Sequence, residues 1–264
     1  TSIISNTFTV TAGSNINSDG SATVTATTVD LNAATGIGDT ATVNLLASAI
    51  TADTTAGNVF LKNALATVVT LNSLTTGSGS VSFEQSDGGT LTASTVSAST
   101  SATLTNSAAA IALNGSFIAD SLRVDASGTV TDGTDGDLDI TNNADFTGTS
   151  ITLGNDAGNT TSFGSLTFNS IGAVVVQEDS STALAGTNTA LSLDLDSTDT
   201  ITDGSTSVAI TNLADFNGTA INVGGAGTTT NFGTLTFNSA GSVVIQEDSS
   251  TALGGVNTAL SLDL

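Results

Sequence analysis

The sequence predicts an all-β fold, a right-handed parallel β-helix (β-solenoid) with about 20–25 residues in each turn. Three observations predict it. The composition favours strands and turns over helices, short segments alternate apolar and polar residues, and a long stretch of the second half of the chain is repeated.

The composition favours strands joined by tight turns. Threonine, which is β-branched and suits strands, is abundant, and the 264 residues include 28 glycines but no proline. Proline would remove a hydrogen-bond donor from any interior strand, so its absence fits a body made of paired strands. Hydrophobic residues make up 38% of the chain and the mean hydropathy is +0.26, which argues against disorder despite a net charge of −22.

Short segments with a period of two indicate the strands. SVSFE (80–84), SLRVD (121–125), SLTFN (165–169) and LSLDL (191–195) place apolar residues on one face and polar residues on the other. Turn sequences separate such segments, for example SDGG (86–89) and NDAGN (155–159). Evenly spaced short strands also occur in sandwiches and barrels, so the repeat decides between these folds.

Residues 144–195 match residues 214–264 almost throughout. Phe146 recurs as Phe216 and Phe168 as Phe237, which gives a repeat of about 69–70 residues. The second copy is shorter by one position, which is missing from a Gly-rich loop. Within this unit Leu166, Leu191, Leu213 and Leu235 suggest three turns of about 23 residues.

One apolar position per turn continues this spacing upstream. The predicted ladder is Leu61, Phe83, Leu104, Val124, Phe146, Phe168, Leu193, Phe216, Phe237 and Leu262, and a parallel one is Leu71, Leu91, Ile111 and Val130. Equivalent strands of successive turns would pair in parallel, about 4.8 Å apart.

The chain divides into a β-helix body at residues 56–264 and a first segment at residues 1–55 without a secure register, which is either a capping region or a set of divergent turns. The last residues, LSLDL, equal residues 191–195, so the chain stops within a repeat. An open strand edge is expected there. Either a longer protein continues, or this end docks head-to-tail on another subunit.

The charge and the missing residue types exclude several functions. With 24 acidic residues and only Lys62 and Arg123 as cations, we expect no nucleic-acid partner. Without cysteine or histidine, neither disulfides nor Ser-His-Asp catalysis are available. No apolar run is long enough to span a bilayer as a helix, so we expect no membrane insertion. Arg123 should pair with a nearby aspartate.

Acidic clusters are the candidate metal ligands. They comprise Asp132, Asp135, Asp137, Asp139, Asp194 and Asp196. On strands, these carboxylates would point away from their apolar neighbours and could supply the oxygen ligands of a structural Ca²⁺ ion. A calcium-binding nonapeptide repeat does not occur intact, so the alternative is a solvated, negatively charged face without a cofactor.

Glu178–Asp179 and Glu247–Asp248 form a repeated acidic pair. Two carboxylates could serve glycoside hydrolysis, but adjacent residues on a strand face opposite ways and cannot act on one bond. Their duplication favours a structural corner, so we expect no catalytic residues and no enzyme. Asn114, Asn159 and Asn217 match the N-glycosylation pattern and are candidate sites for surface glycans.

The repeat LTFNSxGxVVxQEDSxTALxGxNTALSLDLxSxxxITDG resembles those of giant secreted bacterial repeat proteins, similar to filamentous-haemagglutinin-type adhesins and autotransporter passenger domains. The resemblance covers residues 131–264. It implies a right-handed β-helix, export by a Gram-negative-type bacterium and an extracellular or cell-surface location. It carries over no catalytic residues.

Three functions are compared. The leading hypothesis is a non-enzymatic building block of a cell-surface filament, layer or matrix fibre that associates head-to-tail with itself. The second is the stalk of a large secreted adhesin whose binding tip lies outside this segment. The third and weakest is a carbohydrate-active β-helix enzyme.

Overall fold

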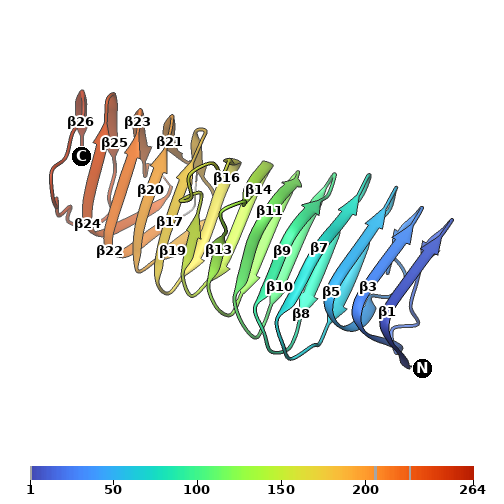
Figure 1. The fold of residues 1–264 in the computed structure, drawn as a ribbon. Coiled ribbons are helices and arrows are strands. Elements are labelled where there is room, and N and C mark those ends of the chain that lie inside the picture. Colours follow the sequence, from blue (N-terminus) through green and yellow to red (C-terminus); the bar gives the residue numbers. More distant parts are fainter. Residues whose placement is uncertain (1, 205–206, 226) are drawn as a thin grey trace. The chain divides into compact units, whose positions relative to one another are not determined.

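The computed structural model describes residues 2–204, 207–225 and 227–264, and every regular element within them is a β-strand. The chain forms two compact units, residues 1–137 and 138–264. In each unit the strands stack in parallel from one turn to the next (Figure 1), and the turns of a β-solenoid number about 12 in all. The predicted all-β, parallel solenoid is confirmed.

The strands of the first unit are β1 (Ser2–Ala12), β2 (Asn15–Ile16), β3 (Thr23–Ala33), β4 (Gly36–Ile37), β5 (Val43–Thr54), β6 (Val59–Asn63), β7 (Val69–Thr76), β8 (Val81–Gln85), β9 (Leu91–Ser97), β10 (Ser101–Asn106), β11 (Ile111–Ala119), β12 (Ser121–Ala126) and β13 (Val130–Asp132).

The remaining strands are β14 (Asp137–Gly148), β15 (Ile151–Leu153), β16 (Thr161–Ser170), β17 (Ala173–Glu178), β18 (Thr182–Leu184), β19 (Thr187–Ala190), β20 (Ser192–Ser197), β21 (Thr200–Asp203), β22 (Ser207–Gly218), β23 (Ala220–Val223), β24 (Thr229–Ser239), β25 (Ser242–Ile245) and β26 (Ser261–Asp263).

The ladder predicted in the first unit is confirmed. Leu61 lies opposite Phe83, Phe83 opposite Leu104, and Leu104 opposite Val124, so each of these residues is one turn from the next. Residues 2–54 stack in the same way, because β1 pairs with β3 and β3 with β5 in parallel. In the parallel ladder Leu91, Ile111 and Val130 are partners, but Val69 takes the place predicted for Leu71.

In the second unit Phe146 lies opposite Phe168 and Phe216 opposite Phe237, as predicted. Two other assignments are wrong: Leu193 lies between Val174 and Ala214, and Leu262 lies opposite Val243.

The error at Leu193 has a local cause. The turn that follows Phe168 bends at the Ala185–Gly186 corner. As a result, the side-chain amide of Asn188 lies against Phe168, where the sequence analysis placed Leu193. The Asn188 side chain, which is fully buried, accepts a hydrogen bond from the Phe168 N–H at 2.9 Å. Leu191 and Leu213, which the sequence placed in one series with Leu166 and Leu235, are 43% and 39% exposed and lie outside the core.

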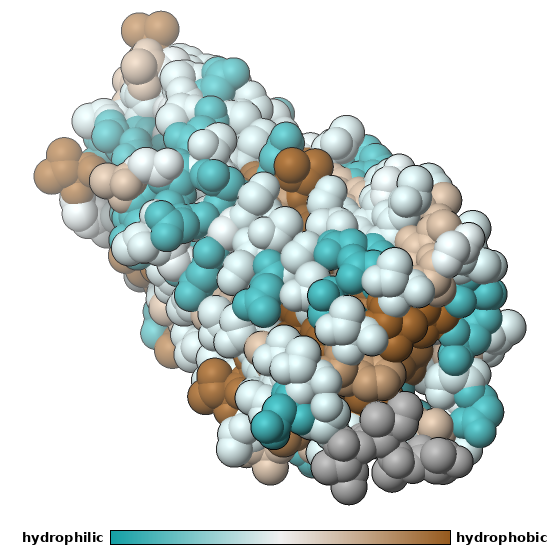
Figure 2. Space-filling model, turned by 45° about the vertical axis from the view of Figure 1, so that its right-hand side comes forward, coloured by the Kyte–Doolittle hydropathy of each residue, from teal (hydrophilic) through white to brown (hydrophobic). Residues whose placement is uncertain are grey.

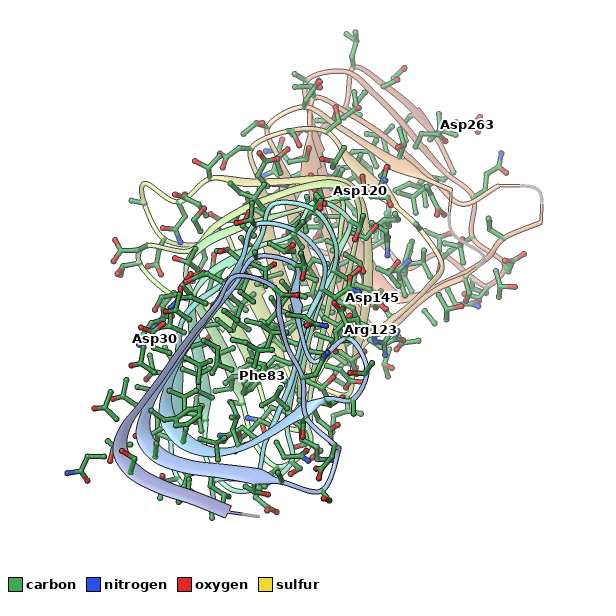
Figure 3. All side chains as sticks on the ribbon, turned by 90° about the vertical axis from the view of Figure 1, so that its right-hand side faces the viewer. Asp30, Phe83, Asp120, Arg123, Asp145 and Asp263 are labelled. Atoms are coloured by element: carbon green, nitrogen blue, oxygen red, sulfur yellow. The ribbon has the colours of Figure 1, made fainter. Side chains whose placement is uncertain are left out.

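The core is a column of inward side chains in each unit. Phe83, Phe146, Phe168, Phe216 and Phe237 are almost fully buried, and valine, leucine, isoleucine and alanine fill the other inward positions. Figure 3 shows Phe83 inside the coil and Asp30 and Arg123 outside it.

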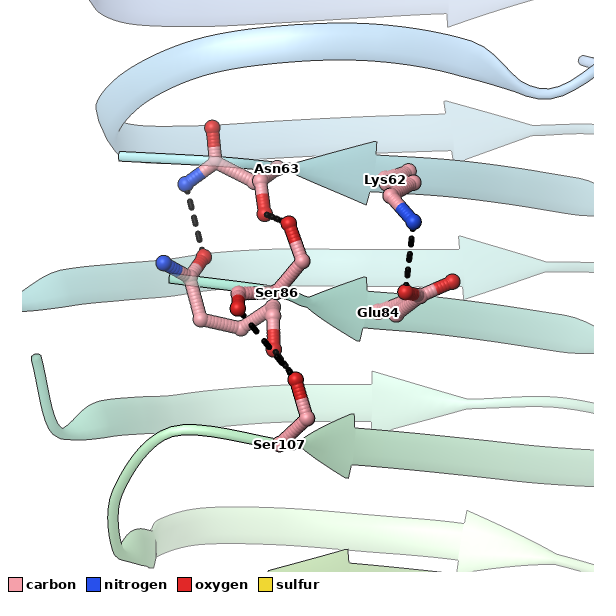
Figure 4. A network of polar contacts seen from close by, with 6 residues as sticks. Lys62, Asn63, Glu84, Ser86 and Ser107 are labelled. Carbon is pink, nitrogen blue, oxygen red and sulfur yellow. Dashed lines mark hydrogen bonds and ion pairs between the residues drawn. The ribbon is translucent and has the colours of Figure 1, made fainter. Parts of the chain in front are cut away.

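Polar columns run along the coils at the corners and on the outer faces. The buried Asn63 amide donates to the Gln85 side chain at 2.8 Å (Figure 4). It also donates to the Ala47 carbonyl at 3.0 Å. Beside it, Lys62 pairs with Glu84 in the next turn at 2.6 Å. These contacts join successive turns, and they satisfy the polar groups that the corners bury.

One loop accounts for the difference in length between the two copies of the repeat. It follows β15 in the first copy and β23 in the second. Each loop begins with a glycine at positive φ, Gly154 (+71°) or Gly224 (+83°), where a Cβ would lie about 2 Å from a carbonyl oxygen of Gln177 or Gln246. In the first copy Asn155, Ala157 and Gly158 are exposed, so this loop lies on the surface of its unit.

Candidate functional site

The repeated acidic pair forms a structural corner. Glu178, at the end of β17, is 2% exposed and accepts hydrogen bonds from the Phe163 N–H at 2.8 Å, the Ser180 hydroxyl at 3.0 Å and the Thr182 hydroxyl at 2.6 Å. Burial raises the pKa of Glu178, although these hydrogen bonds oppose the shift.

Asp179 is exposed, but it binds the same strand as Glu178, because it accepts the Thr161 N–H of β16 at 2.9 Å. The second copy repeats both contacts: Glu247 accepts the Phe232 N–H and Asp248 the Thr230 N–H, each at 2.8 Å. Both carboxylates of each pair therefore bind backbone N–H groups of the preceding turn, as a structural corner requires.

The two copies differ at one atom of this corner. In the first copy Oε2 of Glu178 accepts the hydroxyl of Thr182, which is fully buried. In the second copy Oε2 of Glu247 is buried and has no hydrogen-bond partner, while the equivalent Thr251 is exposed. The corner at Glu247 therefore lacks one bond that its copy has.

The first predicted acidic cluster has the expected alternation. Asp137 and Asp139 are exposed and Leu138 and Ile140 are buried. Asp135 is also exposed, whereas Asp132 at the end of β13 is only 6% exposed. Asp132 is thus not part of an outward acidic face.

The second cluster gains a member that the sequence analysis missed. Asp194 and Asp196 point away from the buried Leu193 and Leu195, as predicted, and Asp194 lies opposite Asp215 in the next turn. Burial raises the pKa of Asp194, and repulsion from Asp196 and then from Asp215 raises it further. Burial also raises the pKa of Asp196, which a hydrogen bond with Asn217 opposes and repulsion from Asp215 supports. The sequence spacing could have predicted that Asp215 joins this cluster, because Asp215 follows Asp194 by one turn of the coil.

An open polar groove lies beside this cluster, lined among others by Asp156, Asp179, Asp196 and Asn217. Even so, no three acidic side chains in the described part of the chain are arranged to hold a metal ion. A structural Ca²⁺ ion at the predicted aspartates stays a prediction. The outward carboxylates give this face its negative charge.

The C-terminal coil (residues 251–264) is the most exposed apolar part of the structure. It repeats residues 182–195 with two differences, Gly254 for Ala185 and Val256 for Thr187. Its exposed apolar side chains have fractional exposures of 51% at Leu253, 87% at Val256, 82% at Leu260, 49% at Leu262 and 50% at Leu264.

Of the four corresponding leucines in the first copy three are buried, and Leu191 is 43% exposed. Leu184, Leu193 and Leu195 are at most 1% exposed, because residues 201–217 of the next turn cover them. In the first copy the next turn therefore covers three of the four leucines whose counterparts are exposed in the C-terminal coil.

The two cations have structural partners. Lys62 pairs with Glu84 at 2.6 Å, and Arg123 pairs with Asp125 at 3.3 Å, which confirms an aspartate partner for Arg123. Both pairs are half-exposed and contribute little to stability. Of the candidate glycosylation sites, Asn114 and Asn217 are exposed and Asn159 is half-buried.

None of the described segments is a helix with the length and apolar character needed to cross a membrane. Comparison with known proteins finds no matching family model, no similar curated protein and no solved structure that matches the fold. The resemblance to filamentous-haemagglutinin-type adhesins and autotransporter passenger domains stays a prediction from the repeat motif.

Proposed function

We propose that this chain is an extracellular, non-enzymatic β-solenoid, a building block of a cell-surface filament, layer or matrix fibre. The observation that carries the proposal is the stacking of the turns: Phe146 lies opposite Phe168 and Phe216 opposite Phe237 in parallel ladders, and these side chains are almost fully buried. A body made of such stacked turns supplies the length and stiffness that a filament, layer or fibre requires.

The mechanism is mechanical. Successive turns join through parallel backbone ladders and through side-chain bonds such as Asn63 to Gln85 and Thr189 to Asn169, so each turn is held by its neighbours. The net charge of −22 keeps the flanks of neighbouring molecules apart and the protein soluble.

The use of the paired carboxylates supports a role other than catalysis. Glu178 and Asp179 each bind a backbone N–H group of the preceding turn, and Glu247 and Asp248 repeat this. These pairs, which were the candidates for a carbohydrate-active enzyme, are occupied in holding corners together.

Electron microscopy of the native material tests the proposal. A building block gives regular polymers whose axial repeat matches one subunit. Isolated rods rooted in cells, each ending in a separate tip, would instead identify the chain as the stalk of an adhesin. Amorphous or monodisperse single particles in both native and purified material would refute the structural proposal.

A further inference from the structure

We propose that Asn114 is a site of spontaneous deamidation, at which the folded chain converts its own asparagine to aspartate and isoaspartate through attack by the Gly115 backbone nitrogen. The two reacting groups lie in β11, which is stacked between β9 and β13 (Figure 1). A bulge in this strand brings them together on the surface of the first unit.

The bulge interrupts the ladder between β11 and β9. Leu113 and Ser116 each have a partner in β9. Between them, Asn114 and Gly115 both face Ser94 and have no partner in that ladder. A bulge leaves its extra residue unpaired and disrupts the hydrogen bonding locally. The peptide between Asn114 and Gly115 is therefore held less firmly than a peptide of a regular strand.

Stacking requires a glycine at the second position of this bulge. A Cβ at residue 115 would lie 1.8 Å from the carbonyl oxygen of Ser94, so no side chain fits there. The same lack of a side chain leaves the Gly115 nitrogen unhindered, because nothing stands between that nitrogen and the amide of the preceding residue. The packing of the turn therefore places the residue that least hinders ring closure directly after an asparagine.

The Asn114 side chain lies on the outside of the coil. Asn114 is exposed, and its Oδ1 lies over Gly133 of the next turn, where a Cβ would come within 2.4 Å of that oxygen. The face of the molecule drawn in Figure 2 is likewise covered mainly by hydrophilic and neutral residues. Solvent water, which the reaction consumes, therefore reaches the amide.

The reaction balances with water as its one further reactant. The Gly115 nitrogen attacks Cγ of Asn114, and its proton passes through water to Nδ2. The Cγ–Nδ2 bond then breaks, ammonia leaves and a succinimide ring remains. Water opens this ring at Cγ to give aspartate, or at the backbone carbonyl carbon to give isoaspartate, in which the main chain runs through Cγ. Each event replaces a neutral amide with a carboxylate.

Asn217 provides an internal control, because it is also followed by a glycine but lies in a regular part of β22. Asn217 and Gly218 both have partners in β24, and the Asn217 amide is hydrogen-bonded to Asp196 of the preceding turn. Ring closure at Asn217 therefore requires the ladder to open first, whereas ring closure at Asn114 does not.

Two other asparagines control for the bulge itself. The bulges of β7 and β22 contain Asn72 and Asn212, which are exposed and precede a serine and a leucine. These two residues have the bulge without the glycine, and Asn217 has the glycine without the bulge. Asn114 combines both features.

Incubation of the purified full chain at mildly alkaline pH, followed by mass spectrometry, tests the proposal. Digestion after Lys62 and Arg123 gives one peptide with Asn114 and another with Asn217. Electron-transfer fragmentation then locates each lost amide and distinguishes isoaspartate from aspartate. The same incubation in urea calibrates the two sites, which should react at equal rates once unfolded. In the folded chain Asn114 should react at least about tenfold faster than Asn217, the factor expected when one backbone hydrogen bond must first break.

Asn114→Gln removes the site. Glutamine keeps an amide but would have to close a larger ring, which forms more slowly. On isoelectric focusing the unaltered chain should gain a species with one additional negative charge, and Asn114→Gln should not. Asn217→Gln is the matched control and should gain that species as fast as the unaltered chain. Circular dichroism establishes that both variants are folded, and Asn114→Ser replaces the first variant if glutamine disturbs the bulge.

Three outcomes would overturn the proposal. Equal rates at Asn114 and Asn217 in the folded chain would mean that the bulge does not release the peptide. Loss of the amide at Asn72 or Asn212 as fast as at Asn114 would mean that exposure decides the rate and the glycine does not. An acidic species that forms as fast in Asn114→Gln would place the reaction elsewhere. None of these results bears on assembly, so the proposed function is tested separately.

Discussion

Leu193 and Leu262 occupy the same position in the two copies of the repeat, and truncating each to alanine measures what the next turn contributes. Leu193 is 1% exposed between Val174 and Ala214, and Leu262 is 49% exposed opposite Val243 alone. The two substitutions remove the same three carbon atoms from similar backbones. Any difference in the loss of stability between the two variants therefore measures what the covering turn contributes.

The expected magnitudes follow from burial. Leu193→Ala removes a fully enclosed side chain and leaves a cavity, so the free energy of unfolding should fall by about 2–5 kcal/mol. Leu262→Ala loses about half of the transfer free energy of three methylene-sized groups and leaves no closed cavity, so the loss should be about 1 kcal/mol. For a chain of this size the melting temperatures should fall by roughly 5–15 °C and roughly 2–4 °C.

The assay is urea unfolding followed by circular dichroism, at a protein concentration at which sedimentation shows monomers. Leu184→Ala and Leu253→Ala form a second matched pair, with exposures of 1% and 51%. Equal losses of stability in the monomer, for both pairs, would refute the reasoning, because they would mean that the C-terminal coil is already as well covered as the internal one.

Three further predictions concern the corner, a glycine and the acidic face. Because burial raises the pKa of Glu178, the folded state binds its proton more tightly than the unfolded state; its contribution to stability is present below pH 4.5 and is lost as the pH rises through the folded pKa. Glu178→Gln should remove this loss, and parallel pH dependences of unfolding in the two proteins would contradict it. Gly164→Ala should cost about 1–3 kcal/mol in thermal unfolding, since its Cβ would lie 2.1 Å from the Thr141 carbonyl oxygen, whereas Gly13→Ala, with nothing within 4 Å, should be nearly neutral. A chelator should leave the melting temperature unchanged if the acidic faces are solvated, and a fall reversed by calcium would identify a metal site.

The fold could be predicted because stacking constrains the sequence. Each turn must place apolar residues above those of the previous turn, and the near-identical copies made the spacing visible through Phe146, Phe168, Phe216 and Phe237. The register failed in the turn after Phe168, where the buried Asn188 side chain, not Leu193, lies against Phe168. A side-chain amide that completes a backbone ladder cannot be predicted from the hydrophobic pattern, because the residue is polar.

The sites were less predictable than the fold. Alternation placed Asp194 and Asp196 outward, but Asp215 joins them from the next turn, so predicting it required the register as well as the pattern. The same pattern gave no warning that Asp132 is buried. The unequal corners at Glu178 and Glu247 could not be predicted at all, because their sequences are alike and only the presence of a covering turn distinguishes them.

The loop after β15 shows where this architecture admits added material. The two copies differ in length there, yet the ladders on both sides keep their pairing: Ile151 lies opposite Val174, and Ile221 opposite Val243. Peptide inserted beside the exposed Ala157 would project from a flank without interrupting a strand. An epitope or enzyme fused at that position would be carried at a fixed spacing along any assembly, which would make the chain a scaffold for ordered display.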